Sequence, residues 1–92
     1  MNFHSLNYFI MLAREKNFTR AAEKLHLTQQ TLSANVAALE KEWGMKFLIR
    51  HVPLELTDAG KVFYAYALQF TRGEEALSRT LKDIANEEAG NL

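Results

Sequence analysis

The chain has 92 residues, 48% of them hydrophobic, and contains no cysteine. This length and composition suit one small globular domain, and they exclude a disordered chain, a disulfide scaffold and a cysteine-based zinc site. The formal net charge is zero, with eight basic against six acidic residues over residues 1–61 and three against five over residues 62–92. Affinity for any nucleic acid therefore has to come from a few well-placed contacts, from dimerisation, or from both.

The first predicted helix extends from about Ser5 to Lys16. Apolar residues recur at i, i+3, i+4 and i+7 and form one buried stripe, made of Leu6, Phe9, Ile10 and Ala13. Either Ser5 or Asn2 can cap the start of this helix, because both side chains accept hydrogen bonds from free backbone N–H groups. Asn17 suits the C-terminal end.

The second predicted helix covers about Thr19 to Leu25. Thr19 is a suitable N-cap by residue type, and Phe18 just before it is placed to pack against the first turn. Ala21 and Ala22 face inward. They permit close approach of two helices, because no side chain holds the backbones apart.

The third predicted helix runs from about Gln29 to Trp43, with Thr28 as its N-cap and Gly44 as the glycine that ends it. Its inward stripe consists of Leu32, Val36 and Leu39. Trp43 either extends this stripe by one turn or packs where the domain joins the last helix. Two short helices around a tight polar corner are typical of a helix-turn-helix, whose second helix enters the major groove of DNA.

Two short strands are predicted at about residues 47–50 and 54–57, on either side of the turn formed by His51, Val52 and Pro53. Pro53 cannot donate a ladder hydrogen bond, so the pair is an edge hairpin. A small hairpin that follows a recognition helix is the wing of a winged helix.

A long final helix starts after Thr57, its predicted N-cap, and continues to about Glu88. Thirty residues give a length of about 45 Å, which exceeds what a winged-helix core needs. An apolar seam with heptad-like spacing follows this helix, namely Phe63, Tyr66, Phe70, Leu77, Leu81 and Ile84. The first turns can cover the core of the same chain, but the last three residues lie too far along to fold back. They predict burial against a second copy, and hence a homodimer.

With these elements in place, the sequence resembles the N-terminal DNA-binding domain of LysR-type transcriptional regulators over residues 1 to about 88. The resemblance rests on the order and spacing of five elements and on three signatures, Ala21-Ala22, Gln29-x-x-Leu32-Ser33 and Leu56-Thr57-x-Ala59-Gly60. It implies a mainly α fold. Residues 1–57 would form a winged helix-turn-helix of three helices and a two-stranded wing, and residues 58–92 a linker helix for dimerisation with a frayed C-terminus.

The resemblance also implies a function. Members of the family bind double-stranded DNA as homodimers, at an interrupted AT-rich palindrome beside a promoter, and pair their linker helices antiparallel. A small-molecule effector is expected only with a further C-terminal domain, which these 92 residues do not include. The expected identity is thus a bacterial, cytoplasmic, nucleoid-associated regulator of transcription, either as an excised fragment or as a natural short form.

Two positions depart from the family pattern on the surface that should meet DNA. Family members often carry a basic residue directly after the serine of the recognition helix, where this chain has Ala34. The family wing is commonly longer and holds a second arginine, whereas this wing holds Arg50 alone. Loss of two phosphate contacts flattens the salt dependence of binding by roughly 2 on a log–log scale, so we expect weaker or narrower binding than in a typical relative.

The candidate base contacts lie on the outward faces of the third helix. Gln29 can bind adenine bidentately through its amide, and Ser33 can hydrogen-bond to several bases. Further polar candidates on this helix and its cap are Thr28, Gln30, Thr31 and Asn35. The alternative for all of them is an ordinary solvated or capping role.

The remaining candidates would contact the DNA backbone or the minor groove. Thr19 and Arg20 lie at the start of the second helix, where free N–H groups and a guanidinium can bind phosphate. Arg50 opens the wing turn and either reaches the minor groove or pairs with Glu55 across the hairpin. His51, next to it, is a further candidate at low pH.

No catalytic or metal-binding constellation competes with this interpretation. The three histidines share no ligand spacing, Glu40 and Glu42 are predicted to be solvated on a helix edge, and the scattered glycines form no phosphate loop. No segment has the pattern of a signal peptide or approaches the roughly 20 apolar residues of a membrane span. We expect no enzyme activity, cofactor, metal or membrane partner. The remaining alternative is a winged-helix module that binds protein and little DNA, which the zero net charge favours.

Overall fold

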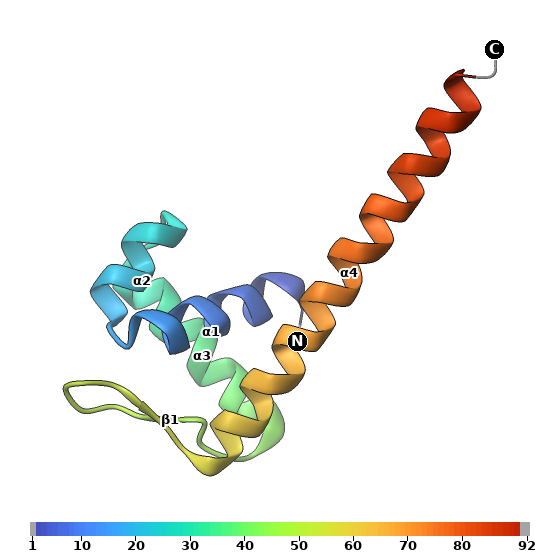
Figure 1. Ribbon diagram of the computed structural model, residues 1–92. Coiled ribbons are helices and arrows are strands. Elements are labelled where there is room, and N and C mark those ends of the chain that lie inside the picture. Colours follow the sequence, from blue (N-terminus) through green and yellow to red (C-terminus); the bar gives the residue numbers. More distant parts are fainter. Residues whose placement is uncertain (1, 91–92) are drawn as a thin grey trace.

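The computed structural model of the chain describes residues 2–90 (Figure 1). The elements follow in the order α1 (Phe3–Glu15), α2 (Phe18–Leu25), α3 (Gln29–Trp43), β1 (Leu48–Ile49), β2 (Glu55–Leu56) and α4 (Asp58–Gly90). The first three helices and the hairpin form a head, and α4 projects from it, so that the Cα atoms span 57 × 25 × 20 Å. This arrangement confirms the predicted winged helix-turn-helix with a long C-terminal helix.

Each of the first three helices starts at a side-chain cap. Asn2 caps α1 by accepting a hydrogen bond from the Ser5 N–H at 2.9 Å, which settles the choice between these two residues. Asn17 caps α2 by accepting from the Arg20 N–H at 2.9 Å, so the prediction of Thr19 as cap was wrong. The earlier start follows from Lys16, which ends α1 in the left-handed conformation (φ 53°) and leaves Asn17 to begin the next helix at once.

α3 has the predicted limits. Thr28 accepts a hydrogen bond from the Thr31 N–H at 3.1 Å at its start, and Gly44 ends it with φ 70°. The predicted inward stripes of α1 and α3 are buried, as are Ala21 and Ala22 of α2. The largest fully buried side chains come from α1 and α3: Phe9, Leu12, Leu32 and Val36. The three helices therefore share one core, as the apolar spacing predicted.

The wing is a shorter hairpin than the sequence predicted. Leu48 pairs with Leu56 and Ile49 with Glu55 in an antiparallel ladder of two residues per strand. The ladder does not extend to Leu54, because the N–H of Leu54 donates instead to the carbonyl of Lys16 at 3.4 Å. This bond fastens the wing to the turn between α1 and α2.

The start of α4 is locked onto the segment that precedes β1. Thr57 caps the helix by accepting from the Gly60 N–H at 3.0 Å, as predicted, and its hydroxyl donates to the Lys46 carbonyl at 2.7 Å. The Phe47 carbonyl accepts from the Thr57 N–H at 3.0 Å and lies so close to Gly60 that a Cβ there would overlap it. Only glycine permits this approach of the helix to the segment that precedes β1.

The first turns of α4 complete the core of the head. The Phe63 ring stacks on Phe47, with centroids 4.6 Å apart, and meets Phe9 edge-on at 5.1 Å. Ala67, one turn later, is buried against Leu6 and Ile10. Phe63 was predicted either to join the dimer seam or to cover the core of its own chain, and in this structure it is half-buried against Phe9 and Phe47 of its own core.

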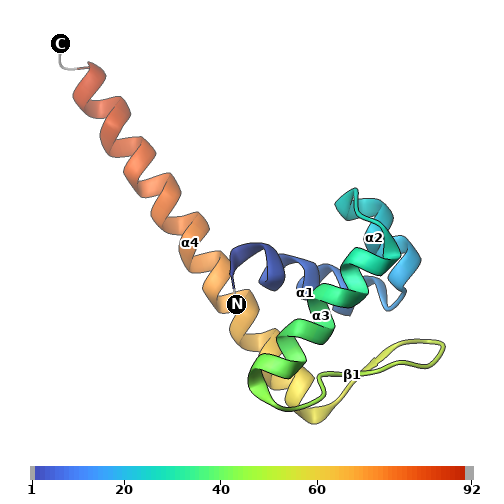
Figure 2. The same cartoon turned by 180° about the vertical axis from the view of Figure 1, so that it is seen from behind.

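The rest of α4 extends away from the head in both views (Figures 1 and 2). Its other seam residues are exposed, namely Tyr66, Phe70, Leu77, Leu81 and Ile84. Residues 91–92, which include the end predicted to fray, lie outside the described residues. Within residues 2–90, no helix combines the length and the apolar character needed to cross a membrane.

Candidate nucleic-acid interface

The candidate interface combines α3 with the start of α2 and the wing. The wing and α2 lie at the end of the head away from α4, and the first half of α3 lies between them (Figure 2). Leu32, Val36 and Leu39 hold the underside of α3 in the core, at 0–3% exposure. Gln29, Gln30 and Thr31 are exposed on the same helix, and Ser33 and Asn35 are partly exposed. The predicted row of amides and hydroxyls is thus at the surface.

Gln29 joins the two helices of the helix-turn-helix. Its Nε2 donates to the hydroxyl of Thr19 at 2.6 Å. The Thr19 hydroxyl is committed to this contact instead of to a cap, which explains why Asn17 takes the capping role. Gln29 keeps a carbonyl oxygen and a second N–H for another partner, and these are the two groups that bidentate recognition of adenine requires.

The other polar residues of α3 are partly used within the helix. The Thr28 hydroxyl caps the helix and donates to Thr31 Oγ1 at 2.8 Å, so its first role is structural. Asn35 Nδ2 donates to the Thr31 carbonyl at 2.9 Å, which orients its carbonyl oxygen away from the backbone. Gln30 is exposed.

Arg50 lies against α2 and α3 instead of extending from the wing. Its Nη1 donates to Ser33 Oγ at 2.7 Å, and its guanidinium carbon lies 5.0 Å from the ring centroid of Phe18. Its Nη2 is 3.9 Å from a carboxylate oxygen of Glu40. The predicted alternative of pairing with Glu55 is wrong, because the carboxylate of Glu55 lies 3.5 Å from Nε2 of His51.

Glu40 is the functional neighbour that the sequence analysis missed. It is only 4% exposed, and its Oε2 accepts from the Phe47 N–H at 2.7 Å and the Leu48 N–H at 3.2 Å. The prediction of a solvated carboxylate was therefore wrong. A signal was present, because Glu40 continues the inward spacing of Leu32 and Val36 by another four residues.

A shallow groove of about 260 Å³ separates the wing from the start of α2. It is lined by Lys16, Asn17, Phe18, Thr19, Gln29, Arg50, His51, Val52 and Leu54. Arg20 lies nearby in sequence and is exposed, whereas Lys24 of the same helix pairs with Glu15 at 3.1 Å. The predicted contacts Thr19, Gln29, Arg50 and His51 thus share one surface feature.

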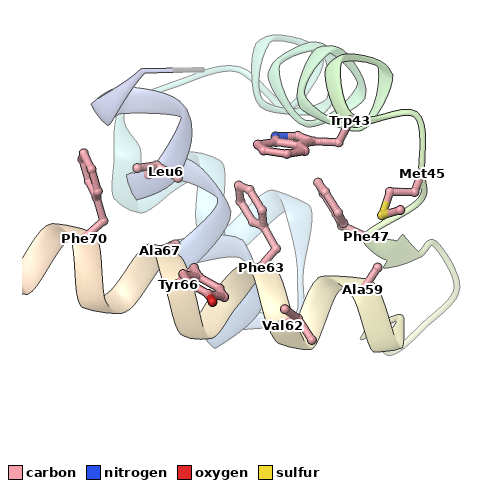
Figure 3. Close-up of a pocket in the computed structure, with 10 residues that line it drawn as sticks. All are labelled: Leu6, Trp43, Met45, Phe47, Ala59, Val62, Phe63, Tyr66, Ala67 and Phe70. Carbon is pink, nitrogen blue, oxygen red and sulfur yellow. The ribbon is translucent and has the colours of Figure 1, made fainter.

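A second groove of about 540 Å³ lies where α1, the end of α3 and the segment before β1 meet the first turns of α4 (Figure 3). Trp43 lines it and is 53% exposed, so its predicted place in the buried stripe was wrong and the alternative at the join with the last helix is confirmed. The groove is apolar, and its other walls include Leu6, Met45, Val62, Tyr66 and Phe70. Among the described residues, no cluster of three or more histidine or acidic side chains could hold a metal ion.

Comparison with known proteins assigns this head to a family. The sequence model described as "Bacterial regulatory helix-turn-helix protein, lysR family" matches residues 3–61, which include every proposed DNA-facing residue. The chain belongs to the LysR family. The match confirms the resemblance seen in the sequence, and the head that it covers runs from α1 to the first turn of α4.

LysR-family relatives are similar along the chain but are longer. A probable cat1 operon transcriptional activator of Acinetobacter lwoffii is 46% identical over 70 residues, which cover 75% of this chain and 23% of that protein. The regulator BudR of Klebsiella aerogenes is 38% identical over 93 aligned residues, covering 100% of this chain and 65% of BudR. The chain therefore spans about a quarter of the first relative and just under two thirds of the second.

Solved LysR-family structures agree with the whole arrangement, including α4. The DNA-binding domain of BenM in complex with benA site 1 DNA superposes with a TM-score of 0.90 at 35% identity, covering 92% of this chain and 97% of that one. The DNA complex of the CbnR DNA-binding domain gives a TM-score of 0.86 at 31% identity, covering 92% and 99%. Both neighbours were solved in complex with DNA.

Proposed function

We propose that this LysR-family chain binds double-stranded DNA as a homodimer and forms the DNA-binding part of a transcription regulator. The observation that carries the proposal is the exposed row of Gln29, Gln30 and Thr31 at the start of α3, above a buried apolar underside. A helix with this division presents its first residues to the major groove. Similarity to domains solved on DNA supports the same interpretation.

Individual residues have distinct proposed roles. Gln29 binds an adenine through its amide, and Ser33 reads a second position, each contact contributing about 1–3 kcal/mol of discrimination. Thr31, Gln30 and Asn35 add contacts along the same helix, and Thr28 contributes through the cap that fixes the helix start. Arg20 and Thr19 bind phosphate at the start of α2. His51 approaches the backbone or the minor groove from the wing tip.

The homodimer is proposed to form through α4 and the apolar groove. Leu77, Leu81 and Ile84 are 45–58% exposed, although water is an unfavourable environment for such side chains. An antiparallel partner helix would place them beside the groove around Trp43, and full burial of each contributes about 1.5–3 kcal/mol. Residues 1–57 thus form the DNA-binding part and residues 58–92 the dimerisation part.

Two-fold symmetry determines the kind of DNA site. A symmetric dimer presents two recognition helices to two half-sites, so the expected operator is an interrupted palindrome, AT-rich as in the family. Chains of this family act in the bacterial cytoplasm at the nucleoid, and we expect the same here, with no catalytic activity. Response to a small-molecule effector would require a further domain, and relatives such as the cat1 operon activator are long enough to contain one.

Selection of bound DNA from a random pool tests the proposed function. The unmutated chain is expected to enrich a palindromic sequence, with binding that weakens as salt increases. Gln29→Ala should relax preference at one or two positions in each half-site, whereas Arg20→Ala should weaken binding to all sequences alike. Binding that is indifferent to salt and to both substitutions would favour the protein-binding alternative. Sedimentation as a monomer at tens of micromolar would contradict the homodimer.

A further inference from the structure

Arg50 lies where the wing, the recognition helix and the start of α2 meet. It follows β1 directly, donates to Ser33 of α3 at 2.7 Å, faces Glu40 of α3 at 3.9 Å and stacks on Phe18 of α2 at 5.0 Å. The side chain is 39% exposed, so more than half of its surface is covered. A guanidinium held on three sides is suited to fixing the geometry of the DNA face.

We propose that Arg50 is a positioning residue that fixes Ser33 as a hydrogen-bond donor toward DNA, and is not itself a phosphate or minor-groove contact. The proposal rests on the proposed function, since it concerns how this chain reads DNA. It assigns to Ser33 an acceptor on the nucleic acid. That acceptor is a base-edge nitrogen or oxygen in the major groove, or a phosphate oxygen.

The direction of the Ser33 hydrogen bond follows from donor chemistry. A guanidinium has only donors, so in the 2.7 Å contact the serine oxygen must accept. The hydroxyl keeps one proton, and no described residue accepts it. Because one lone pair is already used, the hydroxyl meets DNA most favourably as a donor. Without Arg50, the same hydroxyl could rotate and either donate or accept.

Glu40 explains why Arg50 stays in place. The buried carboxylate accepts two backbone N–H groups of the wing strand, from Phe47 and Leu48, through one oxygen, and its other oxygen faces Arg50. Lys46 lies 4.0 Å from that second oxygen, but its side chain is 82% exposed to water. If Arg50 moved to a phosphate, its hydrogen bond to Ser33 would break. The buried carboxylate of Glu40 would also lose a nearby positive charge, which is energetically costly.

The test compares four proteins on DNA: the unmutated chain, Ser33→Ala, Arg50→Met and the double variant. Methionine keeps an apolar stem over Phe18 while removing every donor and the charge. Affinities are measured by fluorescence anisotropy for the selected sequence and its single base-pair variants, at several salt concentrations. Arg20→Ala is the matched control, since Arg20 is an exposed arginine proposed to bind phosphate. Thermal unfolding of each variant verifies that it is folded.

Positioning predicts a specific pattern. Ser33→Ala and Arg50→Met should relax the same base pair by a similar factor, between about fivefold and 150-fold, and the double variant should be no worse than either single variant. Arg50→Met should keep the salt dependence of the unmutated chain. Arg20→Ala should flatten the log–log slope by about 0.9 for each phosphate lost. Ser33→Ala and Arg50→Met could instead weaken binding to all sequences equally, with a loss in the double variant no larger than in either single variant. The acceptor would then be a phosphate oxygen, and the positioning role of Arg50 would stand.

Two results would overturn the proposal. One is an Arg50→Met slope that flattens as much as that of Arg20→Ala, which would make Arg50 a phosphate contact. The other is multiplication of the two single effects in the double variant, which would make the two residues independent. Absence of salt-dependent binding by the unmutated chain would instead overturn the proposed function, and it would be seen before any variant is compared.

The donor direction has its own test at the base pair that Ser33→Ala relaxes. Replacing adenine there by purine, or cytosine by 2-pyrimidinone, removes the exocyclic amino group, which is the only major-groove donor of the pair. The ratio of the affinities of the unmutated chain and Ser33→Ala should stay the same on the altered DNA. A ratio that falls to one would show that the hydroxyl accepts from that amino group, contrary to the assignment.

Discussion

Gly60→Ala is expected to destabilise the domain, although alanine is the better helix former. A Cβ at this position would overlap the Phe47 carbonyl oxygen and lie 2.9 Å from the carbonyl carbon. That carbonyl also accepts the Thr57 N–H at 3.0 Å, and the Phe47 ring is stacked on Phe63. The strand cannot yield without weakening the hydrogen bond or the stacking, so α4 would have to tilt away from the head.

The magnitude follows from three contributions. Over-packing costs about 1–3 kcal/mol, and a weakened backbone hydrogen bond costs about 1 kcal/mol more. Replacing glycine by alanine in a helix recovers about 1 kcal/mol. The net loss in the free energy of unfolding is therefore about 2 kcal/mol, which lowers the Tm of a domain of this size by roughly 8–16 °C.

Thermal unfolding followed by circular dichroism measures this loss, with all proteins at one concentration because the Tm of a dimer depends on it. Gly73→Ala is the matched control, since a Cβ at Gly73 has no neighbouring atom within 4 Å. The control should gain about 0.5–1 kcal/mol from helix propensity alone. A Gly60→Ala protein that unfolds at or above the Tm of the unmutated chain would refute the proposed close approach of α4 to the strand.

Three further predictions concern the cap of α2 and the dimer. Asn17→Ala should lower the free energy of unfolding by about 1 kcal/mol, because it removes the N-cap, while Thr19→Ala should cost less; denaturant titration compares the two. Leu81→Glu should shift sedimentation toward the monomer, since a charge would enter the helix seam, and an unchanged distribution would exclude Leu81 from the interface. The emission of Trp43, the only tryptophan, should shift to shorter wavelength as protein concentration rises through the dimerisation range, and a constant spectrum would mean that the groove stays open.

Local signals predicted the helices well because they depend on neighbours in sequence. The limits of α3 follow from the Thr28 cap and Gly44, and both contacts exist as the residue types predicted. The start of α2 was misplaced because Asn17 and Thr19 are both good caps. A contact across ten residues, from Gln29 to the Thr19 hydroxyl, removes Thr19 from the choice, and spacing within one helix cannot reveal it.

The polar network of the candidate site was less predictable, because it joins residues 7 to 17 positions apart. Glu40 was predicted to be solvated, although its spacing from Leu32 and Val36 fits the inward side of α3. A carboxylate is stable there because it accepts hydrogen bonds from the N–H groups of Phe47 and Leu48, which lie far from it in sequence. The position of Arg50 likewise depends on its contacts with both Ser33 and Glu40. The sequence placed Gln29 and the polar residues after it on the exposed side of α3, but it did not predict that Arg50 contacts Ser33 and Glu40.

The same network changes what the net charge implies for DNA binding. Arg50 faces Glu40, and Lys24 pairs with Glu15, so each of these cations already has a carboxylate partner within the chain. Arg20 and Lys16 are exposed beside the recognition surface and remain as the cations best placed for phosphate. Four phosphates neutralised by a dimer give a slope of about −3.6 for log K against log salt concentration.

A titration series between low and moderate salt, with the selected operator, measures this slope. A value near −3.6 means that affinity depends mainly on neutral amides and hydroxyls, and that discrimination between sequences changes little with salt. A slope of about −7 or steeper would require twice as many phosphate contacts. Arg50 and Lys24 would then have to leave their carboxylates on binding, and a rigid, preformed DNA face would be excluded.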